Sequence, residues 1–211
     1  MTERSRLSAE ASRETLPETD SHMLPVRVAT IADIPALEEL IGLSVRALSV
    51  GFYTAAQVDA AMDQVFGVDT QLIADGTYYV IQSSARLAAA GGWSARRTLY
   101  GGDRMKQGDD PLLDPATDAA RIRAFFVHPD WARRGLARQL YATCEQAARA
   151  AGFHRFELMA TLPGEPFYHV LGFTGVERVV STLAGGVEIP FIRMTRPIDL
   201  ADPSSPHDVR P

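Results

Sequence analysis

The sequence predicts an α+β domain, an α/β/α sandwich in which helices flank a mixed, mostly antiparallel sheet of six to seven strands. Short runs of β-branched and aromatic residues alternate with longer segments whose apolar residues recur every three to four positions. Turns that contain glycine join several neighbouring runs directly, which is typical of antiparallel strands. One strand is instead followed by a long helix and a further strand, as in a crossover unit.

The N-terminal third supplies a strand and two helices. Residues 26–29 form a short strand by propensity, and Thr30 and Asp33 have the spacing of a helix cap. Thr54 and Gln57 repeat that spacing before a second helix, which is predicted to end at Gly67. The apolar stripe of the first helix consists of Leu37, Leu40, Ile41, Val45 and Leu48.

A predicted hairpin follows over residues 77–82 and 86–93. Gly91 and Gly92 weaken its second strand and indicate a bulge or a close approach of another backbone segment. Residues 95–119 have little periodicity and many charges, and a loop of this length is usually functional or mobile.

The C-terminal half begins with a strand over residues 121–127 and a helix over residues 136–151, whose apolar stripe places Cys144 toward the core. The remaining predicted elements are a strand at 154–160, a short helical turn at 166–171 and two strands at 176–183 and 187–195.

The composition is that of one globular domain. Of the 211 residues, 46% are hydrophobic and 22% are charged, so we expect a domain at residues 25–197 between a disordered tail (1–24) and a flexible tail (198–211). The net charge of -5 argues against nucleic acid and anionic membranes as partners, since these require basic surfaces. Cys144 is the only cysteine, which excludes an internal disulfide and favours a cytoplasmic location.

The junction before the helix at 136–151 has the composition of a phosphate-binding turn. Gly135 lies where the loop becomes helix, and a residue without Cβ lets backbone amides approach phosphate oxygens closely. Arg133, Arg134 and Arg138 place three guanidinium groups around the same turn. The alternative, a solvated basic start of an ordinary helix, stays open on these residues alone.

Two motifs resemble those of the Gcn5-related N-acetyltransferase (GNAT) superfamily, and the resemblance covers residues 25–197. Residues 127–140, V-H-P-D-W-A-R-R-G-L-A-R-Q-L, are similar to the family's acetyl-CoA pyrophosphate loop, Q/R-x-x-G-x-G/A. Residues 167–173, F-Y-H-V-L-G-F, are similar to the family's F-Y-x-x-x-G-F. Ala132 stands where the loop usually has Gln or Arg, so backbone amides, with Arg133 or Arg134, would have to hold the pyrophosphate.

The resemblance implies the acetyltransferase (GNAT) fold with acetyl-CoA as the acyl donor. The strand before the turn would hold the pantetheine arm through backbone hydrogen bonds. Tyr168 matches the family tyrosine that donates a proton to the departing CoA sulfur, and its structural alternative is a surface aromatic on the short helix. The cofactor-binding residues expected from the resemblance are Phe126, Val127, Arg133, Arg134, Gly135, Leu136, Ala137 and Arg138.

Fewer residues can be assigned to the binding of the amine that accepts the acetyl group. Arg123 alternates with Phe125 and Val127, so it is predicted to share their face and to read an acidic group of the substrate, with a rim salt bridge as the alternative. Trp93 is a candidate wall of the acceptor pocket, with core packing as the alternative. The candidate general bases, which the sequence does not rank, are Glu157, Asp63 and Asp75.

Together these features predict an acetyl-CoA-dependent N-acetyltransferase in which a primary amine of a small molecule or a peptide attacks the thioester directly in a ternary complex. An amine like that of lysine is almost fully protonated at pH 7, so a base or a desolvating pocket is needed. No metal is expected, because His128 and His169 lack further ligands at suitable spacing. The alternative function is an acyl-CoA-binding sensor or interaction module without turnover. A sheet of this kind can also support a homodimer.

Overall fold

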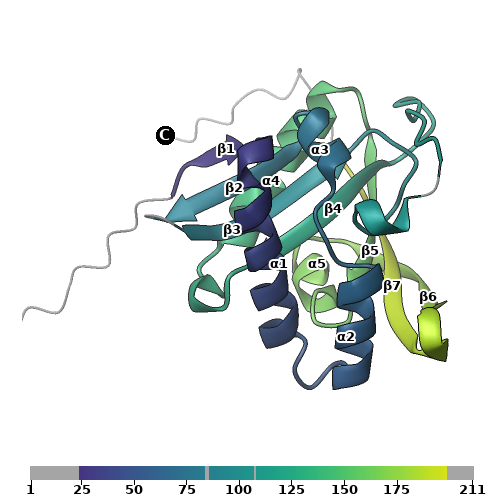
Figure 1. The fold of residues 1–211 in the computed structure, drawn as a ribbon. Coiled ribbons are helices and arrows are strands. Elements are labelled where there is room, and N and C mark those ends of the chain that lie inside the picture. Colours follow the sequence, from purple (N-terminus) through teal and green to yellow (C-terminus); the bar gives the residue numbers. More distant parts are fainter. Residues whose placement is uncertain (1–23, 84–85, 107, 199–211) are drawn as a thin grey trace, which may run out of the picture.

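The computed structural model describes residues 24–83, 86–106 and 108–198, which form a seven-stranded sheet in the order β1-β2-β3-β4-β5-β7-β6 (Figure 1). The strands are β1 (Val26–Val28), β2 (Tyr78–Ser83), β3 (Arg86–Ser94), β4 (Ala120–Val127), β5 (Arg155–Thr161), β6 (Thr174–Thr182) and β7 (Glu188–Pro197). The α-helices are α1 (Ile34–Leu48), α2 (Ala55–Gln64), α3 (Thr70–Ala74), α4 (Leu136–Ala150) and α5 (Glu165–Val170). Short 3-10 turns are η1 (Ile31–Asp33), η2 (Asp103–Met105), η3 (Pro129–Trp131) and η4 (Ala184–Gly186).

The strand pairing is mostly antiparallel, as predicted. β1, β2, β3 and β4 pair antiparallel in sequence order, and β7 pairs antiparallel with both β5 and β6. β4 and β5 are parallel, and α4 connects them. The predicted fold class, a mixed sheet with one crossover unit, is therefore confirmed.

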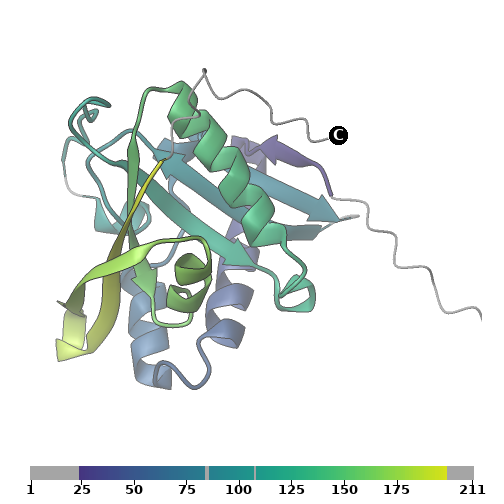
Figure 2. The ribbon, with the colours of Figure 1, turned by 180° about the vertical axis from the view of Figure 1, so that it is seen from behind.

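Helices cover both faces of the sheet and bury two large apolar clusters. α1, α2 and α3 lie on one face (Figure 1), and α4 and α5 lie on the other (Figure 2). On the first face, Leu37, Leu40 and Ile41 of α1 are buried against β2 and β3. On the second face, Cys144 of α4 is fully buried in a cluster with residues of β5 and α5, as its position on the apolar stripe predicts.

The caps explain where the first two helices begin. The Asp33 carboxylate accepts from the Thr30 N–H at 2.7 Å, and η1 leads directly into α1. The Thr54 hydroxyl accepts from the Gln57 N–H at 3.2 Å at the start of α2. Both predicted caps are confirmed, although α2 ends at Gln64, before the predicted stop at Gly67.

The structure adds one short helix to the predicted elements and shows how the long loop is held. α3 has five residues, too few for an apolar stripe, and it forms because the Asp69 carboxylate accepts from the Gln71 and Leu72 N–H groups. The described part of the 95–119 loop is held by specific contacts. Arg96 pairs with Asp75 at 2.6 Å and forms an isolated bridge with Leu112.

The ends of the described chain are packed against the domain. Gln139 donates to the Leu24 carbonyl, and the Ile198 N–H donates to the His154 carbonyl. The rest of the two predicted tails, residues 1–23 and 199–211, lies outside the described residues. Within the described ranges, none of the helices has the length and apolar character that crossing a membrane requires.

Candidate active site

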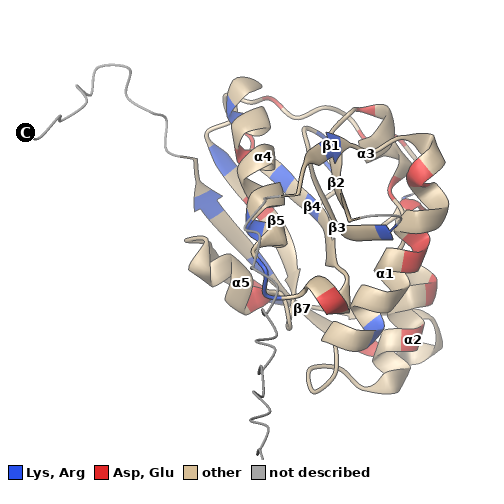
Figure 3. Cartoon of the chain, turned by 90° about the vertical axis from the view of Figure 1, so that its left-hand side faces the viewer, with Lys and Arg blue, Asp and Glu red and all other residues tan. Residues whose placement is uncertain are grey.

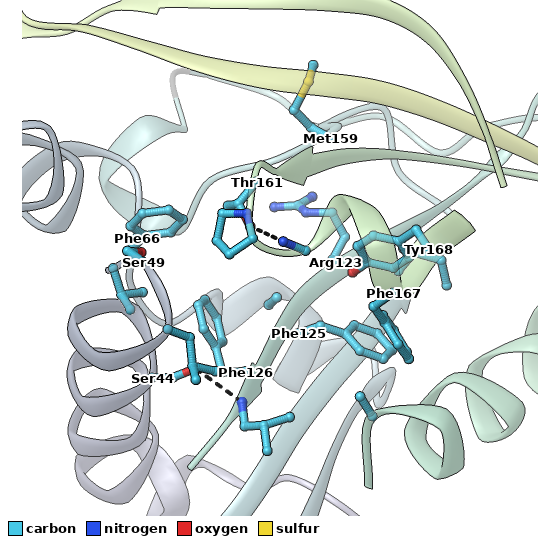
Figure 4. Close-up of a pocket in the computed structure, with 18 of the residues that line it drawn as sticks. Ser44, Ser49, Phe66, Arg123, Phe125, Phe126, Met159, Thr161, Phe167 and Tyr168 are labelled. Carbon is cyan, nitrogen blue, oxygen red and sulfur yellow. Dashed lines mark hydrogen bonds between the residues drawn. The ribbon is translucent and has the colours of Figure 1, made fainter. Parts of the chain in front are cut away.

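A cavity of about 770 Å³ lies where β4 and β5 separate (Figure 4). The two strands pair only at Ala120 with Phe156 and at Arg121 with Glu157. β4 then runs on to Val127, and no described strand pairs with it on that side. The His128 N–H bonds the Ala88 carbonyl of β3, whereas the Val127 N–H bonds the Ser44 hydroxyl of α1 at 3.2 Å. The separation leaves a strand edge whose backbone groups can face a ligand.

A bulge in β4 shapes this edge. Ala90 pairs with Phe126 but Gly92 pairs with Arg123, so β4 has one residue more than β3 over this stretch. Ala124 has a φ of 55°, the left-handed region that few non-glycine residues adopt. The Phe125 ring lies over Gly91, where a Cβ would come within 2.9 Å of it. A Cβ on Gly92 would come within 2.7 Å of the Thr77 carbonyl oxygen, so both the irregular pairing and the close backbone approach predicted at the glycine pair are confirmed.

The bulge corrects one sequence-based inference. Regular alternation predicts that Arg123 shares a face with Phe125 and Val127, and this is wrong. Phe125 contacts the Tyr168 ring on the α5 side of the sheet, with centroids 6.4 Å apart. The Arg123 guanidinium instead binds Asp69, next to α3 on the opposite face. An extra residue in a strand reverses the alternation beyond it.

The turn before α4 forms one end of the cavity. Arg133 and Gly135 both have positive φ values, 66° and 82°, and α4 begins at Leu136. Among the described residues, no side chain caps the start of α4, and its first turn has no acidic residue. Unpaired N–H groups and the helix dipole make such an end favourable for an anion. A Cβ on Gly135 would find no atom of the described chain within 4 Å, so the turn is open there.

Tyr168 of α5 lies on the wall of the cavity. Its side chain is buried among Phe125, Phe167 and Phe173, and its hydroxyl points into the cavity (Figure 4). Burial raises the pKa of the phenol well above its ordinary value, so Tyr168 is protonated across the physiological range. No hydrogen bond from another described residue engages the hydroxyl. It is therefore available as a donor to a ligand.

Arg123 is partnered within the protein. Its guanidinium donates to the Asp69 carboxylate at 2.7 Å and to the carbonyls of Thr98 and Gly101 at 2.6 Å each. The Arg123 and Asp69 side chains are 2% and 1% exposed, and Lys106 makes a further ion pair with Asp69. Burial lowers the pKa of Arg123, but an arginine remains charged in proteins. The network ties the 98–106 segment to β4.

The structure brings most of the predicted site residues to this cavity. Trp93 and Arg134 do not line it: Trp93 lies in the core against Phe153, with ring centroids 6.0 Å apart, and Arg134 is exposed beside Gly135. The predicted residues that do line it are Arg123, Phe126, Val127, Arg133, Gly135, Leu136, Ala137, Arg138 and Tyr168.

None of the three candidate bases lines the cavity. Glu157 forms ion pairs with Arg121 and Arg193. Asp75 is paired with Arg96, and Asp63 is exposed on α2. His128 and His169 have structural partners as well: His128 accepts from the Asp130 N–H, and His169 contacts Glu165 at 3.3 Å. The described residues contain no group of three or more His, Cys, Asp or Glu side chains placed to hold a metal ion.

The far end of the cavity is built from residues that sequence reasoning missed. Ser49, just after α1, is a buried polar residue of this kind. Ser44 of α1 was missed as well, although it lies beside Val127 at the end of β4, and its position four residues after Leu40 on the apolar stripe could have indicated it. Tyr53 joins three segments, since its hydroxyl donates to the Pro190 carbonyl and accepts from the Leu162 N–H. The missed apolar lining residues at this end include Leu48, Phe52, Phe66, Leu99, Met159 and Phe191.

Sequence comparison assigns the family. The profile of the Acetyltransferase (GNAT) family matches residues 45–173, which include β4, the open turn, α4 and Tyr168. The chain therefore belongs to the GNAT acetyltransferase family. No curated protein sequence matches this chain.

Solved structures show the same fold at low sequence identity. A GCN5-related N-acetyltransferase from Rhodopseudomonas palustris is 18% identical with a TM-score of 0.62, over 83% of this chain and 96% of that chain. The PaiA N-acetyltransferase from Thermoplasma acidophilum, solved with coenzyme A, is 12% identical with a TM-score of 0.55, over 83% and 99%. YncA from Salmonella typhimurium, solved with acetyl-CoA, is 17% identical with a TM-score of 0.55, over 88% and 99%.

Proposed function

We propose that the protein is an acetyl-CoA-dependent N-acetyltransferase that transfers the acetyl group directly to a primary amine. The observation that carries the proposal is the continuity of one cavity from the uncapped start of α4, along the free edge of β4, to the Tyr168 hydroxyl. These three features fit the three parts of an acyl-CoA: the diphosphate, the extended pantetheine arm and the thioester.

The diphosphate end of the donor would be held mainly by backbone. The amides of residues 135–138 are oriented by the left-handed Gly135, and Arg133 and Arg138 line the same end of the cavity. A hydrogen bond to a charged group contributes about 1.5 to 3 kcal/mol, so a few of these amides suffice for firm binding. This arrangement does not need the Gln or Arg that the family usually has at the position of Ala132.

Tyr168 would act on the leaving group. As the amine nitrogen bonds to the acetyl carbon, the carbon–sulfur bond breaks and its electron pair leaves with sulfur. The Tyr168 hydroxyl would donate a hydrogen bond to that sulfur, an interaction that strengthens as the charge develops. Cys144 offers no covalent route, because it is buried in the core and burial raises the pKa of its thiol.

A non-catalytic acyl-CoA sensor is the second candidate. The specific observation in its favour is that no carboxylate or histidine among the described residues lines the cavity to deprotonate an amine. Calorimetry with CoA and acetyl-CoA, combined with CoA release in the presence of amines, separates the two functions. An enzyme binds CoA and releases thiol only with an acceptor, whereas a sensor binds CoA without turnover.

A further inference from the structure

We infer that the acceptor is an uncharged, apolar amine whose nitrogen is already neutral at pH 7, a small arylamine in chemical class, rather than a lysine side chain or a polyamine. This inference rests on the proposed function and assigns its substrate class. It follows from the charges that line the cavity, from the apolar residues at its acceptor end and from the proton balance of the reaction.

The charged residues that line the cavity are all cations. They are Arg133 and Arg138 near the turn and Arg123 at the side of β4, and no acidic residue of the described chain joins them. An ammonium group entering this cavity would leave water without gaining a counter-ion. Burial of an unpaired charge is strongly unfavourable. The cavity therefore favours an acceptor without a positive charge.

Acidic groups on the surrounding elements are engaged elsewhere or face solvent. Glu157 of β5 is held by two arginines, and Asp69 is held by Arg123 and Lys106. The acidic residues of α1 and α2, whose positions are red in Figure 3, are exposed. Three further acidic residues of neighbouring segments have partners. Asp103 accepts from the Thr70 N–H, Glu165 contacts His169, and Glu177 contacts Arg193. Glu188 is exposed. The titratable phenols on the wall are Tyr100, bonded to Ser181, and Tyr168.

The acceptor end is lined by rings and aliphatic side chains. Phe66 and Phe126 meet edge to face with centroids 6.3 Å apart, and the Tyr100 and Phe191 centroids are 5.6 Å apart. At the rim, three apolar side chains of the wall remain accessible to solvent. Leu48, Phe52 and Val170 are 39%, 49% and 69% exposed. Apolar surface of this kind gains free energy when an apolar ligand covers it.

The proton balance explains why such a site needs no base. When a neutral amine attacks, the nitrogen–carbon bond forms, the carbon–sulfur bond breaks, and the proton lost by nitrogen ends on sulfur. The Tyr168 hydroxyl lies on the wall where it can relay that proton. A protonated amine has one proton more, which must first leave for a base, and the lining residues provide none. Fewer than about one in a thousand lysine-like amines are neutral at pH 7.

The test is a panel of acceptors assayed by CoA release with the wild-type chain. 4-Methylaniline and 4-methylbenzylamine carry the same ring but differ in nitrogen basicity, and the amines of spermidine and of a lysine-containing peptide are protonated at pH 7. We expect 4-methylaniline to have the highest kcat/KM at pH 7 and a flat profile from pH 6 to 8.5. For 4-methylbenzylamine, kcat/KM should rise about tenfold per pH unit, following the neutral fraction of the amine.

Other results would overturn the inference. Preference for spermidine or the peptide, or a pKa between 6 and 8 that is the same for every acceptor, would contradict it while leaving the proposed function intact. Binding of CoA without turnover of any amine would contradict it and favour the sensor. Absence of CoA binding in calorimetry would overturn the proposed function and the inference together.

Discussion

The two ends of the cavity are built in different ways. The donor end comes from one continuous segment, the end of β4, the turn and the start of α4, and its groups are largely backbone amides fixed by positive φ values at Arg133 and Gly135. The acceptor end is assembled from separate segments, and its groups are side chains held by long-range contacts such as those of Tyr53 and Arg123. A function shared by a family can thus be carried by local backbone geometry, while acceptor choice depends on tertiary packing.

Arg123→Met tests the buried contacts of the acceptor end and should have the largest effect. The substitution removes the guanidinium partner of Asp69, whose side chain is 1% exposed, and releases the Thr98 and Gly101 carbonyls. Breaking a buried ion pair costs about 3 to 5 kcal/mol, and we expect the free energy of unfolding in urea to fall toward the lower end of this range, since Lys106 still contacts Asp69.

Arg96→Met is the matched control for that change. Its partner Asp75 is more exposed, with side-chain exposures of 24% and 22% for the two residues, so the loss should be at most about 1 kcal/mol. Equal losses for the two variants would show that the Arg123 network does not organise this end of the molecule.

Gly135→Val tests the backbone geometry of the donor end. A β-branched residue at a φ of 82° is strained, and its side chain would stand where the diphosphate is expected. Left-handed backbone costs about 1 to 2 kcal/mol, and each hydrogen bond lost to a charged group costs about 1.5 to 3 kcal/mol. We therefore expect the Kd for CoA, measured by calorimetry, to rise at least about a hundredfold.

Gly185→Val separates strain from ligand contact. Gly185 has a φ of 79°, and a Cβ there would likewise meet no atom within 4 Å, but it lies in η4, away from the cavity. This variant should lose a similar amount of stability and bind CoA like the wild type. Normal CoA affinity in Gly135→Val would contradict the role of the turn.

Tyr168→Phe tests the junction between the two ends. Loss of one hydrogen bond to a developing thiolate should lower kcat about ten- to a hundredfold with little change in CoA affinity. Because burial keeps Tyr168 protonated, the size of this effect should not change between pH 6 and 9. Tyr141→Phe is the control, since that hydroxyl bonds Arg196 outside the cavity. An unchanged kcat in Tyr168→Phe would remove the phenol from the mechanism.

Met159→Glu tests whether the acceptor end disfavours charged amines because its wall has no negative charge, and we expect it to change activity least. Met159 of β5 lines the cavity, so a glutamate there supplies the carboxylate that the wall lacks. We expect kcat/KM for 4-methylbenzylamine relative to 4-methylaniline to rise a few-fold at pH 7, with no rise in Met159→Gln. A rise in both variants would mean that polarity or side-chain shape, rather than the negative charge, limits charged acceptors.

The same contrast between the two ends sets how much of the site could be predicted from the sequence. Gly135 and Tyr168 belong to short local motifs, and the structure places both on the cavity. The face of Arg123 could not be predicted from alternation, because the bulge at Ala124 reverses it. Phe52, Leu99 and Phe191 come together only through the packing of distant segments, which no local pattern encodes.

The most direct test of the central claim is a crystal structure of the protein with bound CoA. The account predicts that the diphosphate oxygens accept hydrogen bonds from amides of residues 135–138, that the pantetheine arm follows the free edge of β4, and that the sulfur lies within hydrogen-bond distance of the Tyr168 hydroxyl. A diphosphate bound away from Gly135, or a thiol directed away from Tyr168, would contradict it.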